Sequence, residues 1–151
     1  MENILNSLRD YATQVMNRNP RSMSIVAVDP IPGVDNAILF KFILISFPAK
    51  VNGLLKGCRS IIGMDGCHLK TTTGGILLSV ISRYCNKQVF SVAYAVVRIE
   101  NTQSWLWFIK LLLESIGIEI VAGWTFIIDR QKVLLHCLLN FNHFLILSGH
   151  F

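Results

Sequence analysis

Two short apolar segments of the sequence each end in an aspartate, and this pattern limits what the chain can fold into. One segment runs from Ile61 to Asp65 and the other from Trp124 to Asp129. A buried carboxylate without a partner is costly, so an aspartate that closes a hydrophobic strand usually has a hydrogen-bond donor, a base or a metal ion beside it. If the two strands are neighbours, both carboxylates lie at one edge of the sheet, where they can bind a divalent metal ion.

The segments that follow Asp65 predict two further strands. Apolar runs at 76–82 and 89–97 are separated by polar turns at 68–75 and 86–88, which predicts two hairpins. The second run is apolar throughout, which is typical of a strand that is covered on both faces.

A helix is predicted between the third of these strands and Asp129. Asn101 or Thr102 is placed to cap its first turn, and Gly117 to end it. Trp107 is expected to be more exposed than the residues of the apolar stripe. That stripe consists of Trp105, Phe108, Ile109, Leu112, Leu113 and Ile116.

The order strand, strand, strand, helix, strand fixes the expected topology. Two hairpins make the first three strands antiparallel, and the helix crosses over to place the fourth strand beside the first and parallel to it. The sequence therefore predicts an α/β fold with a mixed sheet in a ribonuclease H-like arrangement. Asp65 and Asp129 then lie at the carboxyl ends of neighbouring strands.

Residues 1–56 are expected to form a small α+β extension before the core. The apolar spacing predicts a helix over 3–16, and apolar runs predict strands at 22–28 and 37–47. The segment 48–60 is interpreted as a loop or a short helix that leads into the first aspartate strand. The core itself is expected to span residues 57–135, and residues 136–151 form a divergent apolar tail.

Composition places the chain among folded proteins, since 52% of its residues are hydrophobic and 15% are charged. The net charge of +5 permits nucleic-acid binding but does not establish it, because Lys and Arg are scattered. The four cysteines show no CxxC spacing and are interpreted as reduced thiols. The segment from Val133 to Phe151 lacks charged residues, yet its His and Asn residues are unsuited to a membrane span. No membrane association is expected.

Three blocks of the sequence resemble plant Mutator-like element (MULE) transposases. The first, residues 57–70, reads GCRSIIGMDGCHLK. The second, residues 90–108, contains FSVAYAVV, then Asn-Thr and SWLWF, and the third, residues 124–132, reads WTFIIDRQK. Their order and spacing make the resemblance specific, and it extends over roughly residues 11–135.

This resemblance implies the core of a DDE-type transposase, which cleaves and transfers DNA strands at the terminal inverted repeats of its own element. Asp65 and Asp129 would be the first two catalytic acids and would bind Mg²⁺ or Mn²⁺. DNA is the implied partner, the nucleus the implied location, and a homo-oligomer is possible on the same ground. The residues considered as DNA contacts are His68, Lys70, Arg130 and Lys132.

The expected third acid of the family is missing, because residues 130–151 contain neither Asp nor Glu. We therefore expect a truncated transposase core that is inactive by itself. The alternatives are a domesticated module that binds DNA or protein without catalysis, and a relic without a selected function. Each aspartate also has a structural alternative: Asp65 could cap the next turn through the amides of Gly66 or Cys67, and Asp129 could cap a helix that starts at Arg130.

Overall fold

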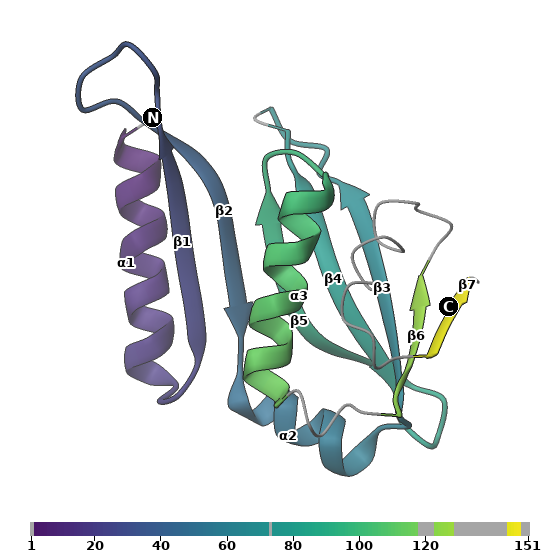
Figure 1. Ribbon diagram of the computed structural model, residues 1–151. Helices are drawn as coiled ribbons and strands as arrows, with labels where there is room; N and C mark the ends of the chain where they lie inside the picture. Colours follow the sequence, from purple (N-terminus) through teal and green to yellow (C-terminus); the bar gives the residue numbers. More distant parts are fainter. Residues whose placement is uncertain (1, 73, 118–122, 129–144, 149–151) are drawn as a thin grey trace.

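The computed structural model describes residues 2–72, 74–117, 123–128 and 145–148. The described strands form one mixed sheet of seven strands in the order β1-β2-β5-β4-β3-β6-β7 (Figure 1). The sequence-based prediction of an α/β fold with a mixed sheet is therefore confirmed.

The N-terminal segment contains α1 (Glu2–Arg18), β1 (Met23–Pro30), β2 (Ile38–Ser46) and α2 (Pro48–Gly57). The helix at 48–57 begins with a proline in its first turn, where the missing amide hydrogen costs nothing. Strand β2 pairs antiparallel with β5, so the β1–β2 hairpin continues the sheet of the core.

The remaining elements follow the predicted order. Strand β3 pairs antiparallel with β4, β4 pairs antiparallel with β5, and β6 lies parallel to β3 after the crossover through α3. The last strand, β7, is parallel to β6. These elements are β3 (Ile61–His68), β4 (Ile76–Arg83), β5 (Val89–Val97), α3 (Thr102–Ile116), β6 (Thr125–Ile128) and β7 (Leu145–Ser148).

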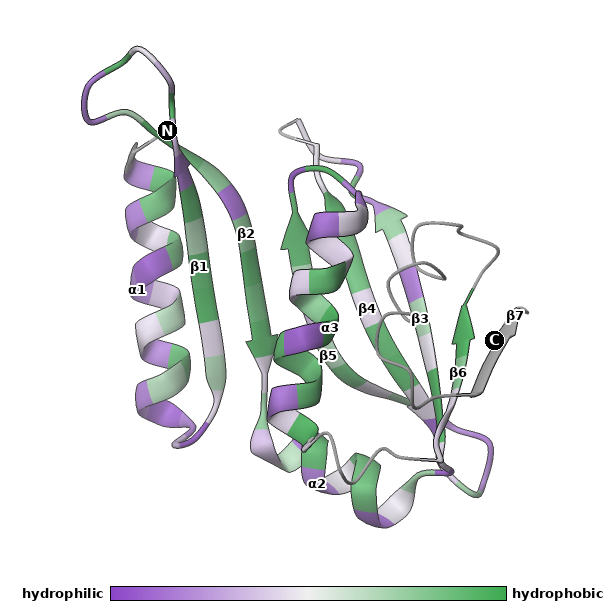
Figure 2. Ribbon diagram, viewed as in Figure 1, coloured by the Kyte–Doolittle hydropathy of each residue, from purple (hydrophilic) through white to green (hydrophobic). Residues whose placement is uncertain are grey.

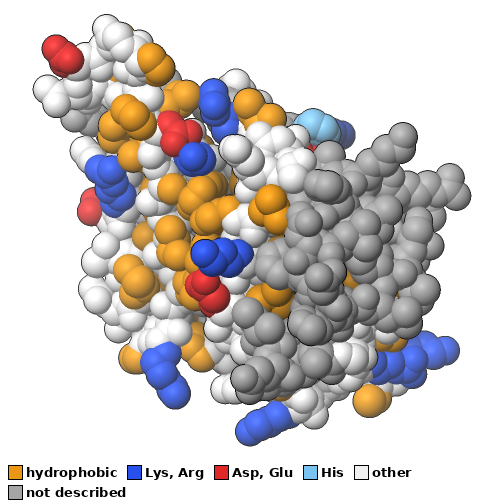
Figure 3. Space-filling model, viewed as in Figure 1, with side chains coloured by type: hydrophobic (Ala, Val, Ile, Leu, Met, Phe, Trp, Pro, Cys, Tyr) orange, Lys and Arg blue, Asp and Glu red, His pale blue; other side chains and the backbone are white. Residues whose placement is uncertain are grey.

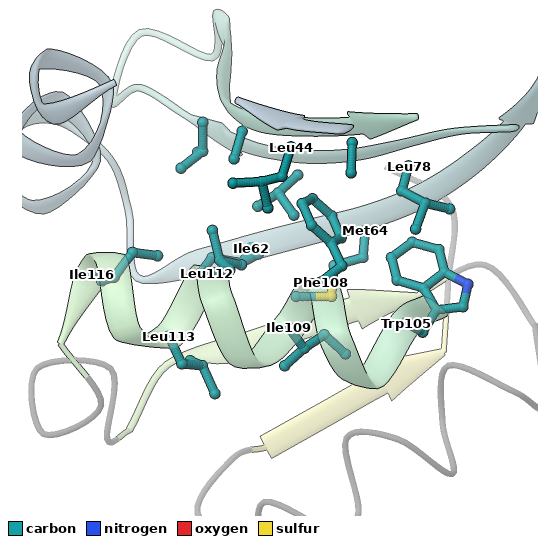
Figure 4. Close-up of a cluster of buried hydrophobic side chains, with 14 of the residues drawn as sticks. Leu44, Ile62, Met64, Leu78, Trp105, Phe108, Ile109, Leu112, Leu113 and Ile116 are labelled. Atoms are coloured by element: carbon teal, nitrogen blue, oxygen red, sulfur yellow. The ribbon is translucent and has the colours of Figure 1, made fainter. Parts of the chain in front are cut away.

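Helix α3 supplies one side of the main hydrophobic core. Its predicted apolar stripe is buried in full, and Trp105, Phe108 and Ile109 have no exposed surface. Figure 4 shows this stripe directed at side chains from the sheet, among them Met64 and Leu78. Because burying each large apolar side chain contributes about 1.5–3 kcal/mol, this contact fixes α3 on the sheet.

Helix α1 packs on the opposite face of β2. Successive residues of a strand point to opposite faces. Phe42 and Leu44 belong to the core under α3, whereas Ile43 lies beside Leu5 and Leu8 of α1. Figure 2 shows the corresponding pattern, since α1 carries hydrophobic residues along one side and hydrophilic residues along the other.

Two expectations about the strands are wrong. Strand β3 does not end at Asp65 but continues to His68, because residues 65–68 pair with β4 and the reversal is closed by the hydrogen bond from Leu69 N to Gly75 O. Strand β5 is not covered on both faces. Tyr94 is 39% exposed while Ala93 and Ala95 are buried, because α3 covers only one face of this strand.

Within the described part of the chain, no helix combines the length and the apolar composition that a membrane crossing requires. Most of the uncharged segment from Val133 to Phe151 lies outside the described residues.

Candidate active site

Asp65 is an exposed residue of β3, directly opposite Ser79 of β4. The hydroxyl of Ser79 donates a hydrogen bond of 3.3 Å to the main-chain oxygen of Asp65. Among the described residues, the carboxylate of Asp65 has no hydrogen bond or ion pair. The expectation of a buried carboxylate is therefore wrong, and so is the alternative in which Asp65 caps a turn, because Gly66 and Cys67 are still strand residues.

The described part of β6 runs up to the position beside Asp65. Ile61 pairs with Thr125, and the parallel register continues to Met64 and Ile128. Asp65 and Asp129 are the next residues of the two strands in the sequence. Asp129 itself, together with Arg130 and Lys132, lies outside the described residues.

A second carboxylate lies against β3 and was missed by the sequence analysis. A Cβ atom placed on Gly66 would lie 2.8 Å from Oε1 of Glu100, so the carboxylate rests on the glycine backbone. The indole Nε1 of Trp105 donates a hydrogen bond of 2.9 Å to the same oxygen. The sequence did contain a signal for Glu100, because it directly precedes the helix cap Asn101 and acidic residues interact favourably with a helix N-terminus.

His68 and Lys70 lie where β3 ends. His68 is the last residue of the strand and Lys70 belongs to the following turn; both are exposed. Figure 3 shows Lys and Arg side chains dispersed over the visible face among hydrophobic ones, without one continuous basic patch. The DNA contacts of His68 and Lys70 stay predictions.

The donor types suit a hard divalent ion, but the described residues do not complete a site. Carboxylate oxygens are the ligands that Mg²⁺ prefers. Asp65 offers one such group, and no described residue competes for it. Nowhere in the described ranges do three or more His, Cys, Asp or Glu residues come together as a metal-binding group. The Glu100 carboxylate lies against Gly66, which faces the opposite side of β3 from Asp65, so Asp129 would have to supply the second carboxylate.

The cysteines in the described ranges differ in their surroundings. Cys67 and Cys85 are exposed, whereas Cys58 is half-buried, and all three are free thiols. Burial raises the pKa of the Cys58 thiol above its ordinary value of 9.0, while a hydrogen bond with Ser82 acts in the opposite direction. Cys58 is therefore the least reactive of these thiols.

Comparison with known protein families assigns the chain to a family. The sequence model of the MULE transposase domain matches residues 61–142, more than half of the chain. The chain belongs to the MULE transposase domain family. No curated protein and no solved structure matches it.

The MULE match begins at the first residue of β3 and includes both Asp65 and Asp129. It covers most of the first block that carries the resemblance and all of the other two. It also extends past residue 135, where the sequence resemblance fades. The N-terminal elements α1, β1, β2 and α2 precede the matched region.

Proposed function

We propose that this chain carries part of a DDE transposase core with a ribonuclease H-like fold. The ancestral activity is metal-dependent cleavage and transfer of DNA strands at terminal inverted repeats, in the nucleus. The observation that carries the proposal is the parallel register of β3 and β6. Its described part reaches Met64 and Ile128, and in the sequence each of these residues is followed by an aspartate of the MULE domain.

Asp65 is suited to bind a metal ion because its carboxylate is exposed and unpaired within the described residues. Asp129 is proposed as the second ligand, since it follows Ile128, the last described residue of the strand next to β3, in the sequence. In an active transposase core, a Mg²⁺ or Mn²⁺ ion held by these carboxylates would supply activation of a water molecule or a 3′-hydroxyl and stabilisation of the leaving oxygen. We propose that four cationic or titratable side chains contact the DNA backbone. These are His68 and Lys70 at the end of β3, and Arg130 and Lys132, which follow Asp129 in the sequence.

Two-ion chemistry requires more carboxylates than residues 65 and 129 provide. Residues 130–151 contain no acidic side chain, and the described residues hold no three-ligand group. We therefore propose that the chain binds DNA and a metal ion but does not cleave DNA by itself. A homo-oligomer is compatible with this proposal.

The alternative is a domesticated module that binds DNA without any metal requirement. The net charge of +5 favours this function, because phosphate contacts supply most of the sequence-independent affinity for DNA.

A paired binding and nicking assay tests the proposal. The wild-type chain is mixed with duplex DNA that carries the terminal inverted repeats, and with a scrambled duplex, in Mg²⁺, in Mn²⁺ and in EDTA. We expect salt-dependent binding with a preference for the repeats, and no nicking in any buffer. An absence of DNA binding would overturn the proposal.

If nicking does occur, comparing the wild type with the Asp65→Asn variant shows whether Asp65 is responsible for it. If wild-type protein nicks DNA and the variant does not, the site is more complete than we propose, and the role of Asp65 stands. If both proteins nick equally, Asp65 is not a catalytic acid. Binding that is equal in EDTA and in metal, for both proteins, identifies the domesticated module.

A further inference from the structure

A cavity of about 440 Å³ opens between the start of α3 and the ends of β1, β2 and β5. Its walls include the aromatic side chains of Phe42 and Trp107 and the polar side chains of Arg98 and Gln103. Its volume lies within the range of small-molecule sites. The proposed roles of Asp65 and Asp129 do not involve this cavity.

The aromatic wall is a stacked pair. The ring centroids of Phe42 and Trp107 lie 3.3 Å apart and the ring planes meet at 25°. Trp107 is half-buried, in contrast to the fully buried Trp105. Phe42 fixes the orientation of the indole, so a flat ligand in the cavity meets a rigid ring. Nucleobases stack on such rings whatever their sequence.

The charge beside this wall comes from Arg98. Its side chain is exposed and has no hydrogen bond or ion pair with any described residue. The other cation of the cavity, Lys41, is neutralised by Asp29 at 2.9 Å. Asn101 and Ser104 are already bonded to each other in the capping box of α3. Arg98 is thus the group available to a phosphate, which a guanidinium can bind through two parallel hydrogen bonds.

The cavity and His68 lie at the same ends of the strands, on one row that crosses the sheet. The strand registers place Phe42 opposite Val97, Val97 opposite Ile76 and Ile76 opposite His68. With about 4.8 Å between strands, the row from Phe42 to His68 spans roughly 14 Å. In duplex DNA the nucleotides of one strand follow each other at about 3.4 Å along the helix axis, so this distance corresponds to roughly four base-pair steps.

We propose that this cavity holds one unpaired nucleotide of a DNA strand, with its base on Trp107 and its phosphate on Arg98. The inference rests on the proposed function only in taking DNA as the ligand. A paired base stays inside the duplex stack and cannot reach a ring in a cavity, so the site favours single-stranded DNA.

Tryptophan fluorescence tests the proposal in EDTA, so that the result is independent of metal binding at Asp65. The probe is a (dT)12 strand titrated into the full chain. We expect saturable quenching for the wild type and at least threefold weaker binding for Arg98→Gln. Trp107→Leu removes the reporting indole, so its binding is measured with a labelled strand, and it is also expected to be at least threefold weaker. Arg59→Gln is the matched control. Arg59 is also exposed, but it lies just before β3, at the end of β3 that is opposite to His68 and the cavity.

Three outcomes would overturn the proposal. In the first, Arg98→Gln and Gln103→Ala, both at exposed positions, bind (dT)12 as tightly as the wild type. In the second, Arg59→Gln loses as much affinity as Arg98→Gln, which means diffuse electrostatic attraction. In the third, a blunt (dT)12–(dA)12 duplex binds as tightly as the single strand, which excludes an unpaired base as the ligand, or free dTMP does, which shows that the site takes a free nucleotide and not a DNA strand.

A Mn²⁺ titration of the wild type and of Asp65→Asn, beside the (dT)12 titrations in EDTA, separates this inference from the proposed function. If metal binding at Asp65 fails but the Arg98 and Trp107 effects are found, the cavity stands and the metal proposal falls. If metal binding at Asp65 is found but the Arg98 and Trp107 effects are absent, the metal proposal stands and the cavity falls.

Discussion

At the scale of single residues, Asp65 is an exposed carboxylate that follows three buried residues of β3, Ile62 to Met64. Nothing in the described structure uses this carboxylate for folding. Asp65→Asn is therefore expected to change the free energy of unfolding by less than about 0.5 kcal/mol, as is usual at exposed sites. Urea denaturation measures this value, with Asp10→Asn on α1 as the control. A loss of 2 kcal/mol or more would show that Asp65 has a structural role.

Gly66 has a different role, because it leaves room for the Glu100 carboxylate. In Gly66→Ala the new Cβ would lie 2.8 Å from Glu100 Oε1 and displace it from Trp105. The expected cost is about 1.5–3 kcal/mol, the net value of a hydrogen bond to a charged group. A double-mutant cycle with Glu100→Ala checks the cause. If Gly66→Ala costs as much without Glu100 as with it, the proposed contact is not responsible.

The environment of Cys58 predicts how stability and thiol modification depend on pH. Because burial raises the pKa of its thiol in the folded chain, the folded state holds this proton more tightly than the unfolded state. Its contribution to stability is complete below pH 9.0 and is lost as the pH rises through the raised value. At pH 8, iodoacetamide is expected to modify Cys67 and Cys85 before Cys58, as followed by peptide mass spectrometry. Equal rates for the three thiols would contradict this.

At the scale of the elements, α3 is held by its cap as well as by its apolar stripe. Asn101 Oδ1 accepts a hydrogen bond of 2.8 Å from the amide of Ser104, and Ser104 Oγ accepts one from the amide of Asn101. Asn101→Ala should destabilise the chain by about 0.5–2 kcal/mol, whereas Asn101→Asp, which keeps the acceptor, should be close to neutral. Thermal or urea unfolding measures both. Equal losses for the two variants would exclude the cap as the cause.

The elements also show what the sequence could predict. The strand order and the crossover through α3 were predictable, because hairpin turns and a period of 3.6 residues are local signals. The end of β3 was not, since Asp65 and His68 are polar and only their pairing with β4 keeps them in a strand. The exposure of Tyr94 was not predictable either, because an apolar run does not reveal how many layers cover the sheet.

At the scale of the whole molecule, the β1–β2 hairpin joins the core by pairing between β2 and β5. The sequence predicts the hairpin strands but not their place in the sheet, because long-range pairing leaves no local pattern. The same limit applies to the candidate site. Asp65 could be selected from the sequence, whereas Glu100 and the Phe42–Trp107 pair became visible only when distant segments were brought together.

The central claim is that the carboxylates at positions 65 and 129 share one metal ion. Its most direct test is a Mn²⁺ titration, followed by electron paramagnetic resonance, of the wild-type chain, Asp65→Asn, Asp129→Asn and the double variant. The account predicts that each single substitution weakens binding at least tenfold and that the double variant is no worse than either one. Wild-type affinity in both single variants, or losses that simply add, would contradict it.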